Sequence, residues 1–121
     1  MQAERFTFPR HKRLLKPAEY QQVFTQQQKI YYQGLVIYYR ENQTGNPRLG
    51  IVVSKRNFKK AVTRNRLKRS IRESFRLHQH LLNSNDIVVA GTKQLTEETL
   101  WRAPAILAEI WQKLVHRSSS T

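Results

Sequence analysis

LGIVV at residues 49–53, a helical pattern over 61–77 and IVVA at residues 87–90 decide the fold of this chain. The two apolar runs are short and rich in β-branched residues, which is typical of buried strands. The apolar residues between them recur at helical spacing, and this stripe should face the core: Leu67, Ile71 and Phe75. A strand, a helix and a second strand in this order predict a parallel pair inside a mixed sheet.

A short helix is predicted upstream. Pro17 suits a first helical position, because its missing N–H would be unpaired there anyway. Apolar residues follow at i, i+3 and i+4 spacing, so the helix should run to about Gln27: Tyr20, Val23 and Phe24. Residues 1–16 are rich in Lys and Arg and contain Pro9, which predicts an extended, flexible basic arm.

Residues 29–40 are mostly β-branched or aromatic and are broken by Gly34. The run fits two short strands, or one bent strand with a bulge at the glycine. Residues 44–47 form a turn cluster of Thr, Gly, Asn and Pro. The strand at 49–53 is therefore expected to close a hairpin with the strand before it.

The C-terminal segment predicts a final helix that begins near Thr96, whose hydroxyl can cap it. Its apolar face comprises Leu100, Ala103, Leu107, Ile110, Trp111 and Leu114. Pro104 lies inside that pattern, so we expect a kink there or a start closer to Pro104. Residues 118–121 are expected to be disordered, which leaves a single domain over residues 17–117.

These elements predict an α+β fold of the α/β sandwich type. Its expected order is a helix, a three-stranded meander, a basic helix, a parallel fourth strand and a C-terminal helix.

The chain has 121 residues and a formal net charge of +14, from 22 Lys and Arg against 8 Asp and Glu. Such a balance favours a polyanionic partner, most commonly nucleic acid, although an anionic membrane surface would also serve. The absence of cysteine excludes disulfides and thiolate metal sites. No signal peptide and no run of roughly 20 apolar residues is visible, so we expect a cytoplasmic protein without a membrane partner.

The positive charge is concentrated in residues 55–76, where Glu73 is the single acid. At 100° per residue, one side of the helix gathers Asn65, Lys68, Arg69, Arg72 and Arg76. A merely solvated basic face usually interleaves acids at i, i+4 spacing, and this one does not. The pattern therefore favours contact with a row of phosphates, and Arg suits bidentate phosphate recognition.

The same segment resembles the signature of the bacterial ribonuclease P protein family: Lys55-Arg56, Ala61-Val62, Arg64-Asn65-Arg66, Lys68-Arg69, Arg72-Glu73 and Phe75-Arg76. The strand at 49–53, the pair Arg13-Leu14, Tyr20-x-x-Val23-Phe24 and the strand at 86–90 are similar to other parts of that family. The resemblance covers about residues 10–115. It departs at Asn57-Phe58-Lys59-Lys60, where family members often carry a glycine-containing turn.

The resemblance implies a protein subunit, one per RNA, of a ribonucleoprotein whose RNA removes the 5′ leader of precursor tRNA with Mg²⁺. It implies contacts with the catalytic RNA by Lys55, Arg64, Asn65, Arg66, Lys68, Arg69 and Arg72. It also implies a cleft for the single-stranded leader, with Tyr20, Phe24 and Tyr38 as candidates. The implied crossover between the parallel strands is left-handed, against the general rule. On spacing alone, Tyr20 and Phe24 would be ordinary core contacts.

Three alternatives compete with this interpretation. A protein-only nuclease would need clustered carboxylates or paired acid and base groups, whereas the acids here are scattered. His78 and His80 are two residues apart and do not share a helix face, so neither a catalytic nor a metal residue is predicted. A ribosomal or other structural RNA-binding protein would have the same electrostatics. A helix-turn-helix DNA-binding module would be compact and helical, and the predicted strands argue against it.

Overall fold

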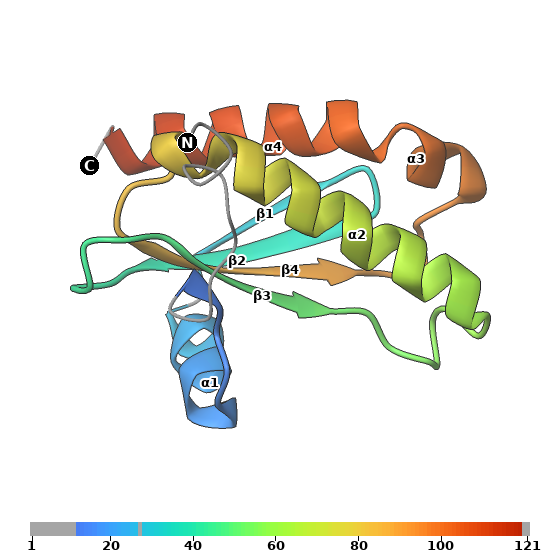
Figure 1. Cartoon of the computed structure of the whole chain (residues 1–121), viewed down its shortest axis with the longest axis horizontal. Coiled ribbons are helices and arrows are strands. Elements are labelled where there is room, and N and C mark those ends of the chain that lie inside the picture. The colour runs from blue at the N-terminus through green and yellow to red at the C-terminus, as the bar shows by residue number, and fades with distance from the viewer. Residues whose placement is uncertain (1–11, 27, 120–121) are drawn as a thin grey trace, which may run out of the picture.

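A four-stranded mixed sheet organises the chain (Figure 1). The computed structural model describes residues 12–26 and 28–119. The strands are β1 (Lys29–Tyr32), β2 (Leu35–Glu41), β3 (Arg48–Val52) and β4 (Asn85–Gly91). They lie in the order β1-β2-β4-β3, with β3 parallel to β4 and the other neighbours antiparallel. The predicted parallel pair in a mixed sheet is confirmed.

Helices cover both faces of this sheet (Figure 1). One face carries α1 (Pro17–Thr25), and the other carries the two long helices α2 (Ala61–His78) and α4 (Ala103–Ser119). Two short elements complete the fold, the 3₁₀ turn η3 (Gln79–Leu81) and the helix α3 (Glu97–Trp101). No helix in the described part of the chain is long and apolar enough to cross a membrane.

The expected hairpin between β2 and β3 is wrong, and the expected three-stranded meander is reduced to β1 and β2. Between β2 and β3 lies β4, whose residues are all buried except the half-buried Ala90. A strand this apolar gains most at the centre, where both of its edges are paired and both faces are covered. The parallel strands β3 and β4 are joined by a crossover through α2. The family resemblance implies that this crossover is left-handed.

The β1–β2 connection is a tight hairpin, so the run at 29–40 forms two strands and not one bent strand. Its two linking residues, Gln33 and Gly34, have φ angles of 55° and 86°. Positive φ at both central residues matches the right-handed twist of a two-residue hairpin.

The core lies between the sheet and the pair α2 and α4. The predicted stripe on α2 is fully buried, and so is nearly all of the predicted face on α4. The indole Nε1 of Trp111 donates a hydrogen bond to Ser74 Oγ at 2.8 Å, which joins the two helices inside the core. The predicted break near Pro104 is also present, because α3 ends at Trp101 and α4 starts at Ala103.

Two predicted boundaries need correction. The basic arm cannot extend to residue 16, because Arg13 forms a parallel bridge with Leu49 and the N–H of Leu14 donates to the Leu49 carbonyl at 2.9 Å. Leu14 is also buried, so apolar burial holds this segment on β3. At the other end, α4 continues to Ser119, where disorder was expected from residue 118. Residues 1–11 and 120–121 lie outside the described part of the chain.

A buried ion pair fastens α1 to the sheet. Arg48, on β3, donates from Nε and Nη2 to the two carboxylate oxygens of Asp86, on β4, at 2.7 and 2.8 Å. Its Nη1 donates to Oε2 of Glu19, on α1, at 3.1 Å. Asn42 donates a further hydrogen bond to Asp86 at 2.7 Å. Because Asp86 is only 1% exposed, its charge depends on these donors.

Glu19 also caps the start of its own helix. Its Oε1 accepts from the backbone N–H groups of Leu15 and Lys16, at 2.7 and 3.0 Å. This is the reach-back bond of a capping box, and it leaves Oε2 for Arg48. The N–H groups of Lys16 and Leu15 and, more weakly, Arg48 hold the pKa of Glu19 below its ordinary value of 4.5.

We predict that Glu19→Gln lowers the free energy of unfolding at neutral pH, and that this difference from the native chain shrinks in acid. The lowered pKa means that the folded state favours the ionised carboxylate. Its contribution is therefore fully present above pH 4.5 and is lost as the pH falls through the folded-state pKa. Urea unfolding of both chains from neutral pH to about pH 3 measures the difference.

The matched control is Glu73→Gln. Glu73 also has a lowered pKa, caused by the hydrogen bond from Arg76, but its side chain is 56% exposed and joins only neighbours within α2. Exposed pairs contribute little, so its effect should be the smaller one at every pH. A Glu19→Gln difference that stays constant down to about pH 3 would contradict the role of its charge.

Candidate nucleic-acid interface

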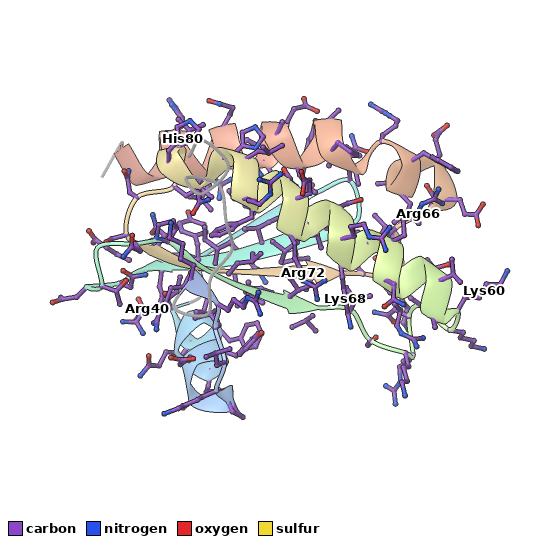
Figure 2. The ribbon with its side chains drawn as sticks, in the orientation of Figure 1. Arg40, Lys60, Arg66, Lys68, Arg72 and His80 are labelled. Carbon is purple, nitrogen blue, oxygen red and sulfur yellow. The ribbon has the colours of Figure 1, made fainter. Side chains whose placement is uncertain are left out.

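The exposed side of α2 carries the basic surface. Leu67, Ile71 and Phe75 turn one side of the helix into the core, which leaves the opposite side to solvent. Exposed there are Asn65, Arg66, Arg69 and Arg72, and Lys68 is half-buried. Lys68 and Arg72 lie on the side of α2 toward β3, whereas Arg66 lies on the side toward α3 (Figure 2). Here the surface formed by Asn65, Lys68, Arg69 and Arg72 is called the basic flank.

Two of the predicted cations form hydrogen bonds or ion pairs with other groups in the described part of the chain. Arg64 Nη1 donates to the carbonyls of Phe58 and Lys59, at 2.8 and 3.0 Å, and so fastens the preceding loop to α2. Arg76 pairs with Glu73, one turn earlier on the same helix. The family resemblance implied Arg64 as an RNA contact, and the helical spacing placed Arg76 in the basic stripe with Asn65, Lys68, Arg69 and Arg72. In the structure, Arg64 stabilises the loop before α2, and the guanidinium of Arg76 pairs with Glu73.

The loop between β3 and α2 is an ordered extension of the basic flank. The N–H of Phe58 donates to the Ser54 carbonyl at 3.0 Å, and the N–H of Asn57 donates to Ser54 Oγ at 3.2 Å. Phe58 is buried in the core and anchors the loop there. Lys55, a predicted RNA residue, and its neighbour Arg56 are exposed on this loop.

A cleft of about 440 Å³ opens beside the basic flank. It brings together three parts of the chain, namely the segment before α1 with α1 itself, the edge strand β3, and α2. Its lining residues are Arg13, Leu14, Leu15, Tyr20, Leu49, Ile51, Lys68 and Arg72. The segment before α1 and α1 itself contribute Tyr20, two leucines and Arg13, β3 contributes Leu49 and Ile51, and α2 contributes the cations Lys68 and Arg72.

Tyr20 reaches this cleft because position 50 has no side chain. A Cβ placed on Gly50 would lie 2.6 Å from Cε2 of the Tyr20 ring, closer than real atoms approach. The glycine therefore lets the ring lie directly against β3. Tyr20 is half-buried.

Phe24 and Tyr38 lie outside the cleft lining. Their rings meet edge to face, with centroids 4.8 Å apart, and both are half-buried. They pack with Tyr20 around a small cluster formed by Leu14, Val23 and Val88. Of the three predicted leader residues, the structure thus places Tyr20 in the cleft and the other two in the adjacent packing of α1 on the sheet.

Beyond Tyr38, the sheet face that carries α1 ends in an apolar strip that is partly exposed. Val36 pairs with Ala90, and Ala90 pairs with Val52, so the three residues lie side by side across β2, β4 and β3. Val36 and Ala90 are half-buried and Val52 is 38% exposed. Sequence reasoning missed this strip, because a run of Val and Ala in a strand gives no signal of which face a helix leaves uncovered.

No group of three His, Cys, Asp or Glu side chains that could hold a metal ion occurs in the described residues. His78 Nδ1 lies 2.8 Å from the Ser74 carbonyl, a helical contact, and His80 is exposed. The described part of the interface thus offers cations and rings to a ligand, which suits a phosphate backbone and unpaired bases.

Comparisons with known proteins identify the family of this chain. Residues 8–115 match the family model described as Ribonuclease P. The Ribonuclease P protein component of Proteus mirabilis is 39% identical over 109 residues, which cover 90% of this chain and 92% of that protein. The component of Chromohalobacter salexigens is 45% identical over 111 residues, which cover 88% and 84% of the two chains.

Solved structures agree. The RNase P protein of Staphylococcus aureus superposes with a TM-score of 0.76 at 29% identity, over 84% of this chain and 93% of that one. The RNase P protein of Thermotoga maritima gives a TM-score of 0.72 at 31% identity, over 84% and 96%. With its sheet order, its basic helix and these matches along nearly the whole length, the chain belongs to the ribonuclease P protein family.

Proposed function

We propose that this chain is the RNA-binding subunit of a ribonuclease P whose RNA performs the chemistry. In this proposal one protein binds one catalytic RNA through the basic flank and the loop that carries Lys55. The adjacent cleft and apolar strip hold the single-stranded 5′ leader of precursor tRNA. Mg²⁺, bound mainly by the RNA, neutralises charge at the phosphodiester that is hydrolysed.

One observation carries the proposal, namely that Tyr20 shares a single cleft with Lys68 and Arg72. A leader varies in sequence, so its site must tolerate any base. Aromatic rings stack on every base, and cations follow the phosphates regardless of sequence. A protein that only supports RNA structure would need the basic flank but not a ring exposed in the cleft beside it.

Continuity between the two surfaces is the second support. Lys68 and Arg72 belong both to the basic flank and to the cleft wall. An RNA on the flank and a strand in the cleft would therefore lie next to each other. In this proposal the protein therefore lies where catalytic RNA and substrate meet, and the RNA supplies the catalytic groups.

Reconstitution tests the proposal directly. We expect the chain to restore leader cleavage by a bacterial ribonuclease P RNA at a low Mg²⁺ concentration, at which the RNA alone is nearly inactive. The added cations replace part of the screening that Mg²⁺ gives at high concentration. Cleavage of labelled precursor tRNA is the measurement. Binding to the RNA without any rescue of cleavage would point to a structural RNA-binding protein instead.

For the basic flank, we predict that Arg69→Ala with Arg72→Ala weakens binding to the catalytic RNA and flattens its salt dependence. Each lost phosphate contact should lower the slope of log K against log salt by roughly 0.7 to 0.9. Lys29→Ala, an exposed cation on β1, is the control of equal charge per site and should leave the slope nearly unchanged. Equal slopes for the double variant and the native chain would exclude these arginines from phosphate contact.

For the cleft, we predict that Tyr20→Ala weakens binding of precursor tRNA by the reconstituted enzyme about five- to a hundredfold, the contribution of one stacked base. Mature tRNA, which has no leader, should bind as before. Tyr20→Phe keeps the ring that would stack on a base, so it should behave like the native chain. Equal losses for both tRNAs would rule out a leader contact.

A further inference from the structure

Trp101 is an exposed aromatic residue that the proposed cleft and basic flank do not use. It is 67% exposed, at the last position of α3. Its neighbour Leu100 is buried and anchors α3 on the core, so the next side chain along this short helix turns outward. An exposed tryptophan is costly to leave in water without a reason, and in recognition surfaces it supplies a large rigid contact area.

Arg66 stacks on this indole. The guanidinium carbon lies 3.7 Å from the ring centroid, a close cation–π contact between α2 and α3. A guanidinium that stacks on an aromatic face can still donate N–H groups from its edge to a phosphate. One turn earlier on the same side of α2, Val62 is 78% exposed and extends the apolar surface.

The surface formed by Trp101, Arg66 and Val62, here called the platform, lies apart from the proposed leader cleft. Arg66 is about 160° around the α2 axis from Lys68 at 100° per residue. Figure 2 shows the two residues on different sides of the helix, Arg66 toward α3 and Lys68 toward β3. The exposed residues Asn65 and Arg69 lie on the helix surface between these two sides. An RNA strand that crosses this part of α2 would therefore meet the platform after leaving the basic flank.

We propose that Trp101 and Arg66 form a second nucleotide site, in which one unpaired base of the bound RNA stacks on the indole face that Arg66 does not cover and Arg66 holds a neighbouring phosphate. The inference rests on the proposed function, since it needs RNA on α2. Charge selects RNA over an apolar protein partner, because the chain carries +14 and the platform borders the basic flank.

The two tryptophans of the chain make the test direct. Trp111 is fully buried and hydrogen-bonded to Ser74, whereas Trp101 is exposed, so bases reach only Trp101. We expect a short oligoriboadenylate, and the ribonuclease P RNA itself, to quench the tryptophan emission of the full chain. In Trp101→Phe, the remaining emission comes from Trp111 and should stay constant during the same titrations. Inorganic polyphosphate, which has charge but no bases, should not quench the native chain.

Affinity for the oligoriboadenylate separates stacking from charge. Trp101→Ala should weaken binding about five- to a hundredfold without altering the salt slope, because a stacked base releases no counterion. Trp101→Phe should recover most of the loss, and Arg66→Ala should lower both the affinity and the slope. Leu77→Ala, an apolar residue of α2 that is 44% exposed, is the matched control and should bind like the native chain.

Three results would overturn the inference. One is binding of oligoriboadenylate or ribonuclease P RNA with unchanged Trp101 emission. Another is a Trp101→Ala chain that binds with native affinity. The third is concentration-dependent self-association of the native chain that Trp101→Ala abolishes, which would make the platform a contact between copies. Rescued leader cleavage with no quenching defeats this inference alone, whereas quenching without rescue defeats the proposed function.

Discussion

The ion pair between Arg48 and Asp86 is the constraint on which the rest of this structure depends. Asp86 is almost fully buried at the start of β4, and the bidentate guanidinium on β3 is its main source of compensating charge. The third nitrogen of the same guanidinium holds Glu19 and therefore α1. A chain with a net charge of +14 thus uses two of its 8 acids to lock one helix onto the sheet, where repulsion would otherwise loosen it.

Everything that distinguishes the cleft follows from that attachment. With α1 fixed at its first turn, Tyr20 lies over Gly50 and its ring lines the cleft together with Lys68 and Arg72. The short α1 leaves the far end of the same sheet face uncovered, at Val36, Ala90 and Val52. The chain belongs to the ribonuclease P protein family. Under the proposed function, these local contacts would give one small protein separate surfaces for a folded RNA and for a single strand.

The spacing of apolar residues predicted the helices and strands well, because each of them buries one stripe or one run of apolar side chains. Leu67, Ile71 and Phe75 are buried as their spacing indicates, and Pro104 marks the division between α3 and α4. Strand order was beyond its reach. Whether β3 pairs with β2 or with β4 depends on which strand is stabilised most by a central position in the sheet. The sequence of β3 alone does not show how β4 would compare with it in that position.

The candidate site was predictable to the same depth. Residue types and helical spacing identified the cations of α2, but not which of them are occupied inside the chain. Arg64 turns back to two carbonyls because of loop geometry that no spacing rule encodes. The pairing of Arg76 with Glu73 follows the i, i+3 spacing of a helix, so this contact was within reach of the sequence. Trp101 was counted in no motif, since it stands at the end of a helix whose apolar face excludes it. Only the contact with Arg66, across two elements, gives it a context.

The attachment of the loop by Arg64 has a thermodynamic consequence. Its two hydrogen bonds, with the buried ring of Phe58, make residues 54–60 and the first turns of α2 one preassembled body. Lys55 and Arg56 are therefore displayed before any ligand arrives, and association need not spend conformational entropy on arranging this loop. If this part of the surface binds RNA as proposed, the loop would dock as a rigid template, without the heat-capacity signature of a segment that folds upon its partner.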